Sequence, residues 1–185
     1  MSSRRVARIA LLVAVGVASL ATQPVEPDRD FEPGPAPSDG WGRAERTEEP
    51  VTSPASWAGT ITFQVDPPSA VVYDRTIVVD VTALGAGARS AQVRLHDADG
   101  TVLLDTTVDA GTSLATWRVD DRLDAAALSG EPWSAELPLA VEVTEGTVAL
   151  RVRATMTLDG AAEGPESESF AIDVAVVPDG VDTGG

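Results

Sequence analysis

The chain has 185 residues with 13 basic and 29 acidic side chains, and its formal net charge is −16 when its single histidine is neutral. This acidity excludes an electrostatic nucleic-acid binder, because such a protein needs a basic face to neutralise phosphates. Cysteine and lysine are absent, which excludes disulfides, thiolate metal sites, cysteine nucleophiles and a P-loop lysine.

Residues 1–21 have the three parts of an export signal. Arginines at positions 4, 5 and 8 precede an apolar run at residues 9–21, which ends in small side chains. As a helix this run extends about 20 Å, against about 30 Å for the hydrocarbon core of a bilayer. The pattern favours a signal peptide cleaved after Ala21, with an uncleaved anchor through residues 9–21 as the alternative. Cleavage leaves 10 basic and 29 acidic residues, and the protein is expected to be secreted or held at the cell surface.

Residues 22–56 are rich in proline, glycine, serine and acidic side chains. They show no apolar period of 2 or 3.6, so nothing offsets the entropy of ordering them. The composition predicts a disordered, acidic, proline-rich linker. Trp41, between two glycines, is the exception, and it either contacts the following domain loosely or forms a recognition motif for a partner.

From Trp57 onward, apolar side chains alternate with polar ones, which is typical of half-buried strands. Turn residues separate the runs, and the turn at 97–100 predicts a tight hairpin. Eight short strands are expected, centred on residues 57–65, 77–83, 91–95, 102–108, 115–119, 135–143, 148–156 and 170–176. The one helical candidate covers Asp121 to Leu128, capped by an aspartate and ended by Gly130.

One apolar and one polar face per strand, with short turns, favours two antiparallel sheets packed face to face. The expected fold class is therefore all-β, a two-sheet immunoglobulin-like sandwich at residues 57–178. A signal peptide and a disordered stalk precede it, and a disordered tail at residues 179–185 follows.

The stretch TVALRVRATMTLDGAAEGPESESFAIDV, from Thr147 to Val174, resembles the last hairpin of fibronectin type III and related bacterial immunoglobulin-like domains. These domains pair an alternating strand with a glycine-rich loop and a final valine-rich strand. The resemblance covers about a quarter of the folded part. It implies a spacer, an adhesion module or a ligand platform.

Catalytic chemistry finds little support in the residue pattern. A Ser-His-Asp triad would have to use His96, which lies on the polar side of its strand, and no serine has the G-x-S-x-G context of a nucleophile elbow. We therefore expect no enzyme activity, no catalytic residue and no cofactor.

Carboxylates offer the only metal candidates. Asp97 and Asp99 bracket a turn, where they could bind calcium or bond to their own backbone. Asp120, Asp121 and Asp124 begin the helical candidate, where acids favour the helix dipole. Each group has a structural explanation, so no metal site is expected, and Asp97 and Asp99 are the weak candidates.

Ligand binding would rest on exposed aromatic rings. The alternation places Trp57, Trp117 and Trp133 toward the core, where large aromatics are usually buried. Trp41 and Tyr73 then remain as surface aromatics and as the weak candidates for a ligand site. Arg151 and Arg153 point outward and are expected to meet acids on a neighbouring strand.

The expected function is a non-catalytic module of the cell envelope or the extracellular space, in a structural or protein-interaction role. A carbohydrate-binding module and an accessory domain of a secreted hydrolase are the alternatives. The expected partner is a protein or a glycan and not a nucleic acid, and residues 9–21, if uncleaved, make the only membrane contact. We expect a monomer, because net charge keeps such a domain soluble.

Overall fold

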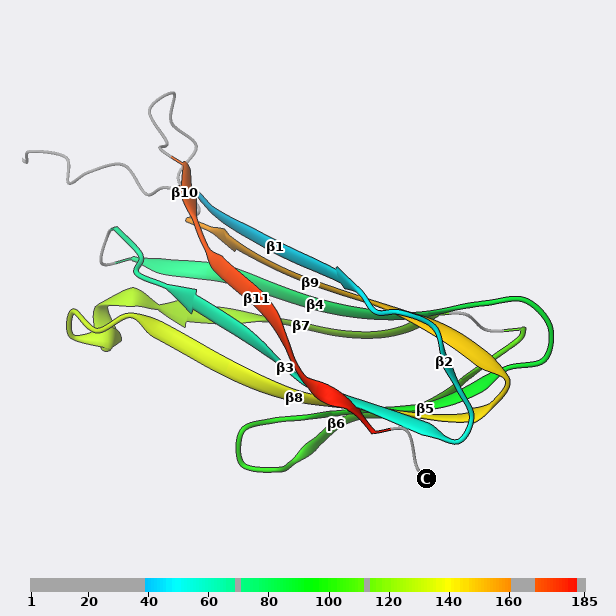
Figure 1. Cartoon of the computed structure of the whole chain (residues 1–185). Helices are drawn as coiled ribbons and strands as arrows, with labels where there is room; N and C mark the ends of the chain where they lie inside the picture. The colour runs from blue at the N-terminus through cyan, green and yellow to red at the C-terminus, as the bar shows by residue number, and fades with distance from the viewer. Residues whose placement is uncertain (1–38, 69–70, 112–113, 161–168, 183–185) are drawn as a thin grey trace, which may run out of the picture. The chain divides into compact units, whose positions relative to one another are not determined.

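Two β-sheets packed face to face form the fold, as predicted (Figure 1). The computed structural model describes residues 39–68, 71–111, 114–160 and 169–182. Sheet 1 has the order β10 (Ser169–Ala171), β1 (Asp39–Thr47), β9 (Thr147–Asp159), β4 (Val72–Leu84), β7 (Leu114–Asp124), and β2 (Val51–Thr52) pairs with β9. Sheet 2 has the order β11 (Asp173–Asp182), β3 (Ala55–Val65), β8 (Trp133–Glu145), β5 (Ser90–His96), β6 (Val102–Asp109). Neighbouring strands are antiparallel except β1 and β10, which are parallel.

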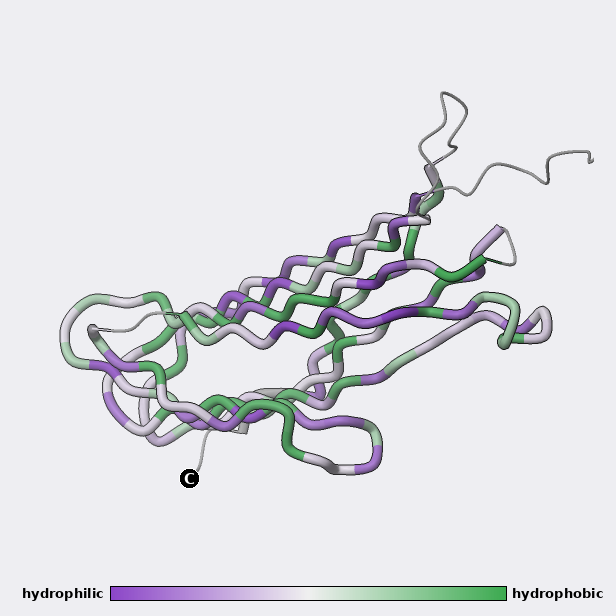
Figure 2. The backbone as a smooth tube through the Cα atoms, turned by 180° about the vertical axis from the view of Figure 1, so that it is seen from behind, coloured by the Kyte–Doolittle hydropathy of each residue, from purple (hydrophilic) through white to green (hydrophobic). Residues whose placement is uncertain are grey.

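The alternation along the strands builds one core between the sheets (Figure 2). In sheet 1, Val79 of β4 lies opposite Ala154 of β9, and both are buried. In sheet 2, Ile61 of β3 lies opposite Leu137 of β8, and both are buried. The strict two-residue period therefore sends one apolar set to the core from each sheet.

One side of the sandwich is closed by two segments that pass from sheet 1 to sheet 2. The first runs from β1 through β2 and the cis Ser53–Pro54 peptide into β3. The second is β10 followed by β11, drawn as one crossing ribbon in Figure 1. The segments touch each other, and such sheet-switching strands close the corners of a sandwich.

This crossing explains the glycines of β1. A Cβ atom on Gly42 would lie 2.2 Å from the carbonyl oxygen of Ile172, and one on Gly40 would lie 2.5 Å from the Phe170 ring. Glycine is therefore required where the second segment passes over β1.

The prediction of a linker up to residue 56 is wrong for residues 39–56. They contain β1, β2 and the start of β3. The alternation of apolar residues does not reveal β1, because glycines, Gly40 and Gly42, occupy its inner face. Residues 22–38 lie outside the described residues, as does the expected signal segment. The expected tail is also wrong at its start, since β11 continues to Asp182. Residues 183–185 are not described.

The predicted helix at 121–128 is mostly wrong. Strand β7 continues to Asp124, and only Ala125–Leu128 forms a short 3-10 helix (η1). Asp124 caps it by accepting hydrogen bonds from the backbone N–H groups of Ala126 (3.0 Å) and Ala127 (3.3 Å). The capping role thus belongs to Asp124 rather than to Asp121.

The second half of the chain changes sheets more often than the alternation indicates. Strands β8 and β9 meet at Gly146 (φ +73°) but lie in different sheets. Strands β9 and β11 also lie in different sheets, so the hairpin implied by the fibronectin-like stretch does not form.

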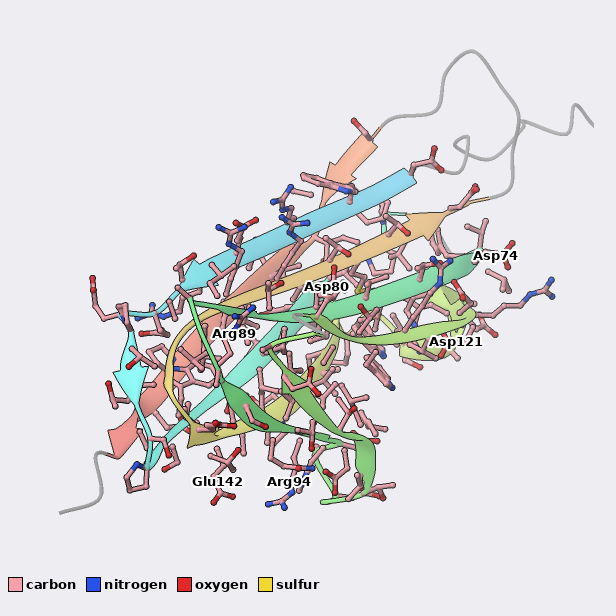
Figure 3. The ribbon with its side chains drawn as sticks, turned by 90° about the vertical axis from the view of Figure 1, so that its right-hand side faces the viewer. Asp74, Asp80, Arg89, Arg94, Asp121 and Glu142 are labelled. Carbon is pink, nitrogen blue, oxygen red and sulfur yellow. The ribbon has the colours of Figure 1, made fainter. Side chains whose placement is uncertain are left out.

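An arginine ties the two sheets together at one end. Arg75 of β4 has inner parity, and its guanidinium donates to both carboxylate oxygens of Asp121, with Nε–Oδ1 at 2.6 Å. The same guanidinium lies 4.5 Å from the ring centre of Trp133, which belongs to sheet 2. Figure 3 shows Asp121 on β7 at this end. The group therefore joins β4, β7 and β8.

Candidate functional site

His96 lies at the end of β5 and is half-buried. Its Nε2 atom is buried without a hydrogen-bond partner among the described residues. Since a general base acts through a hydrogen-bonded nucleophile or water, this environment gives His96 no assembled catalytic geometry.

The two turn carboxylates bond to their own backbone. The side chain of Asp97 accepts from the N–H of Ala98 (2.7 Å), and that of Asp99 accepts from the N–H of Thr101 (2.9 Å). Gly100 completes the turn with φ +85°. In the described part of the chain, no group of three or more acidic or histidine side chains could hold a metal ion. The expected backbone-bonding role of these aspartates is confirmed.

Arginines and carboxylates form a ladder on the outer face of sheet 1. Arg151 and Arg153 of β9 meet Glu45 of β1 at 3.6 Å and 3.1 Å. The expected contact with acids on a neighbouring strand is confirmed, although that strand lies in the segment predicted as linker. Each of five arginines on this face has a carboxylate partner: Arg43, Arg118, Arg122, Arg151 and Arg153.

The ladder holds its groups in the charged form. Hydrogen bonds from Arg43, which has the larger effect, and from Arg153 lower the pKa of the Glu45 carboxyl. Arg118 and then Thr76 donate to Asp120 and lower its pKa from 3.8 to about 2, and Asp120 in turn raises the pKa of Arg118. Outside the ladder, in the turn between β5 and β6, a hydrogen bond from the backbone N–H of Thr101 lowers the pKa of Asp99. Each of these shifts moves the pKa of its group further from neutral pH, whereas a general acid or base works best when its pKa is near the working pH.

The pKa of Asp120 predicts a pH-dependent stability. A carboxyl whose pKa is lower in the folded state stabilises the fold above its unfolded pKa and loses that effect as the pH falls through the folded pKa. The contribution of Asp120 should therefore be complete above about pH 4 and disappear toward pH 2. In thermal unfolding, Asp120→Asn should melt below the wild type at about pH 5 and level with it at about pH 2.

The matched control is Glu142→Gln, because Glu142 is exposed and has no ion-pair partner among the described residues. Its melting difference from the wild type should be smaller at about pH 5. An Asp120→Asn difference that stays constant across this range would contradict the assignment.

The two ligand candidates, Trp41 and Tyr73, and the three tryptophans predicted to face the core have different environments. Trp41 lies on the outer face of β1 and is 60% exposed. The prediction that Tyr73 is a surface aromatic is wrong, since it is fully buried in β4 and packs edge-on against Phe170 with ring centres 6.0 Å apart. Trp57 is buried as predicted, whereas Trp117 and Trp133 are half-buried against the core.

Two shallow hollows lie on sheet 2. The first, of about 490 Å³, has small residues on its outer-face floor, Ala58 and Ala140, with Gln92, Arg94 and Glu142 beside them. Figure 3 shows Arg94 and Glu142 projecting together from this face. The second, of about 590 Å³, lies along β3, β8 and β11 around Thr62, Ser134 and Glu136. Both are open surface depressions without a buried reactive group. The first brings Arg94 and Glu142 together, whereas the charged residues of the second, Glu136 and Asp173, are both acidic.

The side of the sandwich opposite the crossing segments ends in two edge strands, β6 and β7, which contact each other. In the described chain each pairs on one side only. This open side is the feature that sequence reasoning missed, because the alternation shows that a segment is a strand but not whether it lies at an edge.

A scan against protein-family models found no match, and a search of curated proteins found no similar sequence. Within the described residues, no helix has the length and apolar character needed to span a membrane.

Proposed function

We propose that this chain is a non-catalytic, exported module of the cell envelope or the extracellular space. It is an immunoglobulin-like sandwich with a structural or protein-interaction role. The observation that carries this proposal is the pairing of arginines with carboxylates on the outer face of sheet 1. Every resolved pKa shift there favours the charged form. Such side chains stabilise and solubilise a surface, whereas acid–base catalysis favours groups that titrate near neutral pH.

Export is tested on the intact gene product. We expect mass spectrometry to find a mature chain beginning at Thr22 in an extracytoplasmic fraction. Recovery of intact Met1 in the membrane fraction would replace the cleaved signal with the anchor. Intact Met1 in the cytoplasm would contradict the proposal.

A carbohydrate-binding module is the second candidate, because Trp41 presents an exposed indole on the outer face of sheet 1. An indole can stack on the apolar face of a sugar ring while neighbouring polar groups bind hydroxyls. Binding on a glycan array that is lost in Trp41→Ala and kept in Val177→Ala, a change at another exposed apolar residue, would favour this candidate. Binding that is unchanged in both variants would exclude Trp41 as the residue that contacts the sugar.

A further inference from the structure

The edge strand β6 differs from its neighbour β7 in charge. Strand β7 carries alternating arginines and aspartates, with Arg118 bonded to Asp120 and Arg122 to Asp74. Charged side chains of this kind protect a sheet edge from pairing with another chain. Strand β6 has the sequence VLLDTTVD with no basic residue. The charged residues of β6, Asp105 and Asp109, are both acidic, so this edge presents one sign of charge where β7 presents both.

The start of β6 is apolar and accessible. Val102 is 55% exposed, and the next two residues, Leu103 and Leu104, are only half-buried. The inner-face residues of the adjacent edge strand, Trp117 and Val119, are also half-buried. The seam between the two sheet edges therefore leaves apolar surface in contact with water, and covering that surface would be favourable.

The two faces of β6 differ in chemistry. Its outer face carries Asp105, Thr107 and Asp109, which lie opposite Arg94, Gln92 and Ser90 of β5. Its inner face carries Leu104, Thr106 and Val108, which lie opposite the buried residues of β5. A strand added to β6 would place alternate side chains against acids on one face and over the apolar seam on the other.

We propose that β6 is a strand-docking edge that binds an extended segment of a partner polypeptide, in which basic residues alternate with aliphatic residues. Main-chain hydrogen bonds to the unpaired edge supply affinity, and alternate side chains supply specificity. Charge selects the occupant, because a chain of net charge −16 attracts a basic segment and repels a second copy of itself. This inference rests on the proposed interaction role and names the partner class.

The probe is a blocked peptide of alternating arginine and valine, matched to the 8 residues of β6, with the full chain as receptor. The control peptide has the same composition in two blocks, so it keeps the charge and loses the alternation. We expect the alternating peptide to bind at least about tenfold more tightly. Hydrogen exchange should show new amide protection at residues 102–109 and none along β7.

Two protein variants separate edge docking from general attraction. Asp105→Asn and Glu142→Gln each remove one negative charge from the outer face of sheet 2, the first at the edge and the second in the centre. We expect about a fivefold loss of peptide affinity for Asp105→Asn and less than about twofold for Glu142→Gln. An alternating peptide N-methylated along one edge should lose binding to the wild type, because it cannot complete the backbone ladder.

Equal binding of the alternating and block peptides would overturn the proposal, as would equal losses in the two variants. Protection of residues 102–109 that appears without peptide and grows with protein concentration would overturn it in favour of a second copy. A cytoplasmic location would refute the proposed export and leave these binding results unchanged, so the two failures are distinguishable.

Discussion

Replacing Gly42 with alanine should destabilise the protein by about 3 kcal/mol. The new Cβ atom would lie 2.2 Å from the carbonyl oxygen of Ile172 and 2.8 Å from its Cβ. The first of these neighbours is backbone in the segment that crosses over β1, so it cannot rotate away as a flexible side chain could. The free energy of unfolding, measured by denaturant titration, is the readout.

Gly111→Ala is the matched control. A Cβ atom there would meet only the side chain of Asp109, at 3.4 Å, so its free energy of unfolding should stay within about 0.5 kcal/mol of the wild type. If Gly42→Ala had as small an effect as the control, then β1 would not be packed under the crossing segment and residues 39–47 would be the linker that their composition indicates.

Replacing Arg75 with methionine should cost about 2 kcal/mol of unfolding free energy. Methionine keeps the apolar stem but removes the paired hydrogen bonds to Asp121 and the stacking of the guanidinium on Trp133. The side chain of Arg75 is 13% exposed while that of Asp121 is 39% exposed, so solvent weakens the ion pair and the stacking carries a comparable share.

A double-mutant cycle measures that share. Arg75→Met and Trp133→Leu should show a coupling energy of about 1 kcal/mol, because the two side chains are in contact across the sheets. Arg122→Met with Asp74→Asn is the control cycle, since that pair is largely exposed, and its coupling should stay below about 0.5 kcal/mol. Equal coupling in both cycles would show that Arg75 does not tie the sheets together.

The sandwich was predictable where aliphatic residues alternate in long runs. Strands β3 and β9 show this alternation over most of their length, and a two-residue period alone determines which side chains face the core. Strand β1 could not be recognised in this way. Its inner face begins with Gly40 and Gly42, because the side chains of Phe170 and Ile172 fill the space that larger residues would otherwise occupy.

The environment of Tyr73 shows a second limit. Tyr73, Arg75 and Ile77 share the inner face of β4, yet the charge of Arg75 interrupts the apolar period at that point. The alternation therefore predicts a strand that begins at Ile77 and places Tyr73 outside it, near a turn. Only the contacts with Asp121 and Trp133 explain how an arginine is accommodated there. A sequence pattern does not contain such long-range partners.

The candidate docking edge was equally inaccessible from the sequence. Strands β5 and β6 both alternate, but β5 pairs on both sides whereas β6 pairs only with β5. Which strand lies at an edge depends on the pairing order of segments far apart in the chain. The aliphatic start of β6 and its aspartates can contact an added strand only because β6 lies at the edge of its sheet.

Hydrogen exchange of the unmodified full chain tests the account most directly, because the amides of residues 39–47 report whether β1 belongs to the sandwich. Paired with β9 along its length, β1 should have amides that exchange orders of magnitude more slowly than unstructured peptide. Exchange of these amides at the rate of unstructured peptide, while β9 stays protected, would contradict the fold described for this segment.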